Sequence, residues 1–180
     1  SILDEVPKSF PPLFRAFKLS KKAAKKGLDW PDENGVREKV EEEWSEVQAA
    51  VEESEYAGED EIEPIASDAE IEKGNLDGEM TPAQEAKNHL EEEIGDMFFA
   101  LVNYSRHLGV NPDVALARAN KKFYDRFTYV EKKMNDAGVE MSKEKMNENF
   151  EMMDNFWEEA KKEIDSSTRT STALRIARSE

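Results

Sequence analysis

Two pairs of acidic residues, each spaced three positions apart, are the strongest chemical signal in this sequence. Glu43 and Glu46 form one pair, and Glu93 and Asp96 form the other. Residues three or four apart share one face of a helix, so each pair sets two carboxylates side by side. If the two helices pack antiparallel, all four carboxylates converge. Oxygen-only sites of this kind suit Mg2+ or Mn2+, which keep positions open for water and phosphate oxygens.

Asp96 stands out because the segment after it, Met97 to Val102, is apolar around nearly the whole helix. We therefore expect Asp96 and Asn103 at or in the core, where a carboxylate needs a partner or a metal. Glu43 and Glu46 have a competing interpretation as a solvated helix face, since the chain is rich in glutamate.

Cations and an aromatic residue follow later in the chain. Lys122 and Arg126 are one helical turn apart, as are Trp157 and Lys161. The first two suit phosphate oxygens, with arginine giving a bidentate grip, and Trp157 suits a nucleobase. The alternatives are surface cations along a core edge and a tryptophan of the core. The first expected helix carries a further basic face, whose simplest interpretation is that it is exposed to solvent. Its residues are Arg15, Lys18, Lys22 and Lys25.

The elements that must position these residues are helices throughout. Glycine and proline fall at segment edges, and no run alternates strictly between apolar and polar residues. We expect about five helices, near residues 12–26, 35–56, 81–109, 111–137 and 142–164. Their lengths and short connections predict an all-α helical bundle.

Two of these helices carry stripes that predict how they pack. In the second, the apolar stripe is Val36, Val40, Trp44, Val47 and Val51. In the third, the apolar stripe is Ile94, Met97, Phe98, Leu101 and Tyr104. A polar stripe beside it holds Glu93, Asp96, Ala100 and Asn103.

Charge and composition narrow the function classes. The net charge is −16, and the stretch from Glu52 to Met80 supplies −11 of it with 12 acidic residues and one lysine. We expect one domain at residues 1–164, in which residues 57–80 form an acidic, flexible insertion. We expect residues 165–180 to form a disordered tail. The acidity argues against duplex nucleic acid as a partner.

Other function classes are excluded by what the sequence lacks. It has no cysteine, which excludes thiol chemistry and thiolate metal sites. It has only two histidines, which makes a zinc site built from histidines improbable. The longest apolar run is too short to cross a membrane. The N-terminus has no signal-peptide pattern, so we expect a cytoplasmic protein without a membrane partner.

The sequence from about Leu3 to Glu163 resembles the MazG family of nucleoside triphosphate pyrophosphohydrolases, specifically the catalytic C-terminal half of the two-domain bacterial members. The resemblance rests on an ordered series of motifs. They are Leu3-Asp4-Glu5-Val6-Pro7, Lys22-Ala23-Ala24, Asp29-Trp30-Pro31, Glu42-Glu43-Trp44-Ser45-Glu46-Val47, Glu91 to Asn103, Arg106-His107-Leu108-Gly109, Asn120-Lys121-Lys122-Phe123 and Arg126-Phe127.

This resemblance implies the all-α pyrophosphohydrolase fold, with a core completed in a homodimer. It implies Mg2+-dependent hydrolysis of NTPs or dNTPs to the nucleoside monophosphate and pyrophosphate, by water attack at the α-phosphate. The metal ligands would be Glu43, Glu46, Glu93 and Asp96. The nucleotide would be surrounded by Lys39, Glu42, Glu92, Asp96, Lys122, Arg126, Trp157 and Lys161. Catalytic roles fall on Glu42, Glu43, Lys122 and Arg126, with Glu42 and Glu43 as the two alternatives for the general base.

Alternatives and departures accompany this interpretation. The activity could instead be that of a dimeric dUTPase or a phosphoribosyl-ATP pyrophosphohydrolase, although the residues after position 111 favour MazG. A non-catalytic dimerisation or regulatory module is the third alternative, and the intact carboxylate set argues against it. Two features depart from the family pattern: the acidic insertion separates the carboxylate pairs widely, and His89 stands where the family often has lysine.

Overall fold

A computed structural model describes residues 1–53 and 82–176 of the chain. Within these residues the protein is helical and contains no strand, which confirms the predicted all-α class. In chain order the elements are a 3-10 helix η1 (Ile2–Glu5) and the α-helices α1 (Pro12–Ala24), α2 (Glu33–Glu53), α4 (Pro82–His107), α5 (Pro112–Asp136) and α6 (Met146–Ile176). No helix of the described residues has the length and apolar character needed to span a bilayer.

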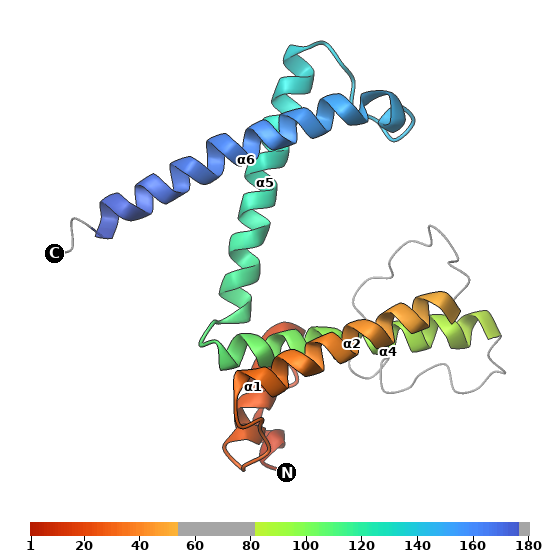
Figure 1. The fold of residues 1–180 in the computed structure, drawn as a ribbon, viewed down its shortest axis with the longest axis vertical. Coiled ribbons are helices and arrows are strands. Elements are labelled where there is room, and N and C mark those ends of the chain that lie inside the picture. The colour runs from red at the N-terminus through yellow and green to blue at the C-terminus, as the bar shows by residue number, and fades with distance from the viewer. Residues whose placement is uncertain (54–81, 177–180) are drawn as a thin grey trace. The chain divides into compact units, whose positions relative to one another are not determined.

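The chain falls into two compact units, Ser1–Val114 and Ala115–Glu180. In the first, α2 and α4 lie side by side and α1 packs against α4 (Figure 1). The two long helices run antiparallel. His89, near the start of α4, has its Nε2 3.9 Å from Oε2 of Glu53 at the end of α2. His107, at the end of α4, has its Nε2 2.9 Å from Oδ1 of Asp29, just before α2.

Polar caps and glycines set the helix ends. The carboxylate of Asp32 accepts hydrogen bonds from the backbone N–H groups of Asn34 and Gly35, at 2.9 and 3.3 Å. This cap starts α2 at Glu33, two residues before the predicted start. After α1 the chain turns through Gly27, whose φ of +88° is the left-handed conformation in which glycine commonly ends a helix.

The last helix differs most from the prediction. The sequence places it at 142–164, whereas α6 starts at Met146 and continues to Ile176. Residues 165–176 contain no glycine or proline to end a helix, although their serines and threonines suggest a frayed tail. The predicted insertion at 57–80 and Thr81, the predicted first residue of the third helix, lie outside the described residues.

The predicted apolar stripes of α2 and α4 are only partly buried: Val36 and Val47 of the α2 stripe are buried, but other members of both stripes are exposed. On α2, Trp44 is 53% exposed and Val51 is 41% exposed. On α4, Phe98 is 59% exposed, and the expectation that the helix is buried on nearly every side is wrong for a single protomer. The residues that α2 and α4 bury are Val36, Glu43, Val47, Ala50, Ala100 and Val102. The packed face of α2 therefore combines Val36 and Val47 of the apolar stripe with Glu43, and the packed face of α4 includes Ala100 of the polar stripe.

The second unit is built from α5 and α6, which cross within it. The phenol of Tyr129 on α5 donates to Oε2 of Glu159 at 3.3 Å and to Oε1 of Glu163 at 3.2 Å. Val130 and Met134 of α5 and Ala160 of α6 are buried. These contacts hold the C-terminal half of α5 against the middle of α6.

Candidate functional site

The carboxylates predicted from the two Glu/Asp pairs come together between α2 and α4. One oxygen each of Glu43, Glu93 and Asp96 lies within 4.8 Å of the others. Glu43 is contributed by α2, and the other two by α4, three residues apart on one face. The antiparallel packing of the two helices is therefore what assembles the cluster.

Glu43 is the buried member of this carboxylate cluster (Glu43, Glu93 and Asp96). Its side chain is 7% exposed, and its Oε1 lies 2.6 Å from Nζ of Lys39, one turn earlier on α2. Lys39 also contacts Oε1 of Glu42 at 3.1 Å. A buried carboxylate needs such a partner, because an isolated charge is costly to remove from water. Hydrogen bonding to Glu43 raises the pKa of Lys39, against the opposing effect of burial, so the ammonium stays charged.

Asp96 is exposed, so the expectation that it lies in the core is wrong. The side chain sits on the open side of the cluster, while Glu43 occupies the buried side. Asn103 is half-buried, and its Oδ1 accepts hydrogen bonds from Arg106 at 2.8 and 3.0 Å. The cluster is thus reachable from solvent through Asp96.

Glu46 stands at the edge of the cluster and is not one of the three converging carboxylates. Its Oε2 is 4.0 Å from Nζ of Lys39, and its side chain is 47% exposed. Partial burial raises the pKa of Glu46, and the nearby carboxylates of Glu43 and Glu93 raise it further, while Lys39 lowers it. Three of the four predicted ligands therefore converge, and the fourth, Glu46, lies close enough for their negative charge to raise its pKa.

The donor set fits a hard divalent cation. The three converging ligands are all carboxylate oxygens, with no sulfur among them, as Mg2+ and Mn2+ prefer. The packing crowds like charges, with Lys39 as the cation that contacts Glu43. A divalent ion among these oxygens would relieve that repulsion.

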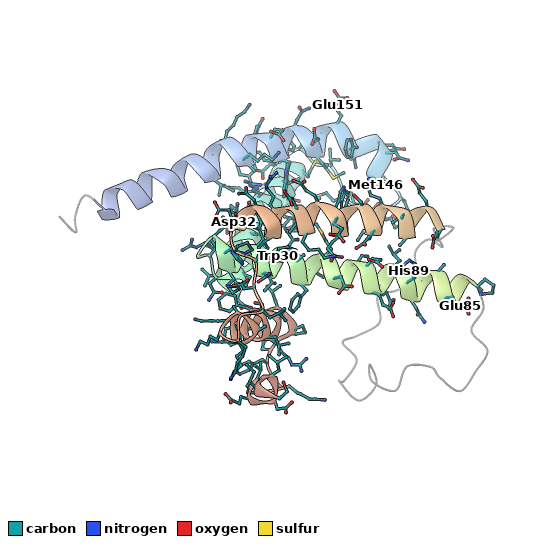
Figure 2. The ribbon with its side chains drawn as sticks, turned by 60° about the horizontal axis from the view of Figure 1, so that its bottom comes forward. Trp30, Asp32, Glu85, His89, Met146 and Glu151 are labelled. Carbon is teal, nitrogen blue, oxygen red and sulfur yellow. The ribbon has the colours of Figure 1, made fainter. Side chains whose placement is uncertain are left out.

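His89, which departs from the family pattern, lies beside the carboxylate cluster. Nδ1 of His89 lies 3.4 Å from Oε1 of Glu93, one turn later on α4. Figure 2 shows His89 and Glu85 toward one end of α4, and Trp30 and Asp32 by the start of α2. The four-residue spacing between His89 and Glu93 was the sequence signal that could have identified this contact. Glu92, predicted to lie near the nucleotide, is exposed.

The predicted nucleotide residues after position 114 lie in the second unit, where two of them, Arg126 and Trp157, are in contact. The rings of Phe123 and Trp157 have centroids 5.5 Å apart at an interplanar angle of 58°. The guanidinium carbon of Arg126 lies 5.8 Å from the centroid of Trp157, a cation–π distance. Lys122 is exposed, and Nζ of Lys161 pairs with Oε1 of Glu158 at 2.5 Å. The structure thus joins Arg126 to Trp157 directly, and each unit carries its own part of the predicted set.

Comparison with known proteins reveals extensive similarity, although no family model matches the chain. It is 36% identical over 166 residues to the nucleoside triphosphate pyrophosphohydrolase of Escherichia coli (strain K12), covering 92% of this chain and 51% of that protein. It is 30% identical over 161 residues to the nucleoside triphosphate pyrophosphohydrolase/pyrophosphatase MazG of Thermotoga maritima, covering 89% of this chain and 48% of that protein.

A shorter match reaches 40% identity over 75 residues of the uncharacterized protein YabN of Bacillus subtilis, which is 42% of this chain and 14% of that protein. The comparisons confirm the predicted resemblance to the MazG proteins. The chain spans about half the length of the two pyrophosphohydrolases that it matches over most of its own length.

Proposed function

We propose that this protein hydrolyses nucleoside triphosphates to nucleoside monophosphates and pyrophosphate, with Mg2+ as cofactor and Mn2+ as a possible substitute. The observation that carries the proposal is the convergence of Glu43, Glu93 and Asp96 from two helices. The proteins it resembles over nine-tenths of its length are named for the same reaction.

In this proposal Glu43, Glu93 and Asp96 hold the metal, with Glu46 as a further ligand from the edge. The bound metal would supply Lewis acidity to the phosphate oxygens of the substrate. Water attacks the α-phosphorus, the bond from that phosphorus to the bridging oxygen breaks, and pyrophosphate leaves. The proton of the attacking water passes to a carboxylate. Glu42 suits this role better than Glu43, because Glu42 is exposed and is not needed as a ligand.

The cations and the tryptophan that the family resemblance implies near the nucleotide have separate roles in this proposal. Lys122 and Arg126 would neutralise the charge that develops on the leaving pyrophosphate, and Lys161 would add to it near the phosphates. Trp157 would stack the base, with Arg126 already packed against its ring. Lys39 would keep Glu42 and Glu43 in place through its two short contacts.

We also propose that the protein works as a homodimer. Large apolar side chains remain exposed on α4, including Phe98, Phe99 and Leu101 at 59%, 42% and 40%. Trp44 of α2 adds to the exposed apolar area. Patches of this kind mark interaction surfaces. Sedimentation should show a dimer at micromolar concentration, and an active monomer would contradict the proposal.

The position of bond cleavage tests the proposed reaction most directly. Hydrolysis of a panel of NTPs and dNTPs in oxygen-18 water, followed by mass spectrometry, should place the label in the nucleoside monophosphate. Pyrophosphate should be the first product, and release should stop when Mg2+ is removed. Label in the pyrophosphate, or orthophosphate as the first product, would place the attack on another phosphorus. Turnover of dUTP alone, or of phosphoribosyl-ATP alone, would assign one of the narrower activities.

A further inference from the structure

The N-terminal part of the chain is strongly basic, in contrast to the rest. Residues 7–28 contain seven lysines and arginines and no acidic residue, in a chain of net charge −16. Three of these cations are already engaged: Lys22 forms an ion pair with Glu5, Nζ of Lys18 lies 4.6 Å from the ring centroid of Phe14, and Lys8 also has an interaction partner. The carboxylate site proposed above uses none of them.

Two of the other lysines line a hollow within the first unit. Lys21 and Lys25 are exposed on the last turn of α1 and just after it, and neither forms a hydrogen bond or ion pair with a described residue. They face a hollow of about 550 Å³, whose other walls include Phe17, Arg106 and Val110. That volume lies in the range of small-molecule sites. All of its lining residues belong to Ser1–Val114, so the hollow is formed by one unit alone.

Arg106 is the fixed cation of this hollow. Its side chain is 15% exposed. Nε and Nη2 donate to Oδ1 of Asn103 at 3.0 and 2.8 Å, and Nη2 also donates to Oδ1 of Asp29 at 2.5 Å. Within the described residues, Nη1 makes no hydrogen bond. The guanidinium is therefore held in one orientation with a donor to spare, which lowers the entropy cost of binding an anion.

Among the described residues, Asp29 is the carboxylate that contacts this arginine, and it forms no ion pair with Lys21 or Lys25. Glu5 is ion-paired with Lys22, and Lys25 acts on Glu5 only as a more distant charge. Asp29 is shared between Arg106 and His107, whose Nε2 lies 2.9 Å from the same oxygen. Lys21, Lys25 and Arg106 thus surround one concave surface as three positive charges. Like charges held around one concavity favour an anion of high charge density, and the phosphate group matches both the lysine and the arginine donors.

We propose that this hollow is a binding site for a phosphate group, either free or as an ester, separate from the carboxylate cluster. Lys21 and Lys25 supply mobile charge, and Arg106 supplies the oriented donor. The carbon surfaces of Phe17 and Val110 can receive the uncharged part of an ester. None of Glu43, Glu93 and Asp96 lines the hollow, so its occupation needs no divalent metal. The inference does not rest on the proposed reaction.

Isothermal titration calorimetry of the full chain in EDTA tests this site apart from any metal or turnover. Inorganic pyrophosphate and adenosine 5′-monophosphate are the two probes. The test variant is the double substitution Lys21→Gln/Lys25→Gln, which keeps the fold because both side chains are exposed. The matched control is Lys26→Gln, which removes one charge from an exposed neighbour that does not line the hollow. Circular dichroism checks that all variants remain helical.

We expect the double variant to weaken binding at least tenfold, since a charge-assisted hydrogen bond contributes enough for a factor of about ten. Lys26→Gln should change the affinity little, and raising the salt concentration should weaken binding to the wild type. Binding of pyrophosphate alone would identify a free anion as ligand, and binding of the monophosphate as well would identify an ester. Absence of binding by both probes at millimolar concentration would overturn the proposal, as would equal affinities of the wild type and the double variant.

Discussion

Asp96→Asn should change stability in opposite directions depending on the metal. Asp96 is the exposed member of a cluster whose oxygens lie within 4.8 Å of one another. Two unit charges at that distance in water repel by about 1 kcal/mol. Removing the charge should therefore leave the metal-free protein as stable as before, or more stable by up to about 1 kcal/mol.

With Mg2+ present the sign reverses, because the ion stabilises the folded state that binds it. A wild-type protein at a metal concentration of 100 times Kd gains about 2.7 kcal/mol. If losing one ligand weakens binding tenfold, the variant at the same concentration gains only about 1.4 kcal/mol. Titrating Mg2+ while following the thermal midpoint should therefore show a smaller shift for Asp96→Asn, starting from an equal or higher midpoint.

Glu91→Gln is the matched control, since it removes one negative charge from an exposed position on the same helix outside the cluster. Its response to Mg2+ should equal that of the wild type. In the activity assay Asp96→Asn should abolish pyrophosphate release while the helical circular dichroism signal persists. Wild-type turnover by Asp96→Asn, or an unchanged Mg2+ shift, would refute the role of this carboxylate as a ligand.

Three further predictions concern the scaffold. Replacing residues 57–80 with a short Gly/Ser linker should leave the thermal midpoint nearly unchanged, because so acidic a segment has little apolar surface to bury; a large drop would show that it packs. Gly35→Ala should lower the free energy of unfolding in urea by about 1–3 kcal/mol, because the new Cβ would lie 2.7 Å from Cε3 of Trp30. Gly95→Ala should raise it by up to about 1 kcal/mol, because no atom lies within 4 Å of the new Cβ and alanine favours a helix. Burial raises the pKa of Asp29, but hydrogen bonds from Arg106 and His107 outweigh burial and lower the pKa overall, so these bonds should stabilise the fold above about pH 4 and lose that effect as the pH falls further. The free energy of unfolding of Asp29→Asn should lack this loss in acid. An Asp29→Asn variant with the same pH profile as the wild type would contradict the prediction.

The helix ends were predictable because they depend on local chemistry. Gly27 and the cap-and-proline pair Asn111-Pro112 fix the backbone within a few residues, and the structure has helix ends at both places. The meeting of Glu43 with Glu93 and Asp96 also followed from local spacing, once antiparallel packing was assumed.

The buried faces of the two helices were only partly predictable from their apolar residues, of which Val36 and Val47 are buried. Trp44 and Phe98 mark the most apolar stripe of each helix, yet both are exposed, while the acidic residue Glu43 is buried. An apolar stripe indicates that one face of a helix is covered, but it does not indicate which element or protein covers that face. Two helices with wide apolar faces can therefore pack at more than one rotation about their axes. The short contact between Lys39 and Glu43 is what makes burial of a carboxylate tolerable, and no periodicity of apolar residues signals it.

The burial of Glu43 beside Lys39 has a consequence for how this protein would change under selection. Glu43 is buried, whereas the side chain of Lys39 is 35% exposed. Replacing an ion pair that has a buried member with apolar residues of similar volume is often neutral or stabilising, whereas removing only the partner of the buried charge is destabilising. A double change such as Lys39→Met/Glu43→Leu is therefore a route to a sturdier helix pair that has lost its central carboxylate. A library screened for heat resistance alone would drift toward such sequences, while one screened for turnover would retain the charged pair. At the centre of the α2–α4 packing, a gain in thermal stability would therefore come with a loss of catalytic activity.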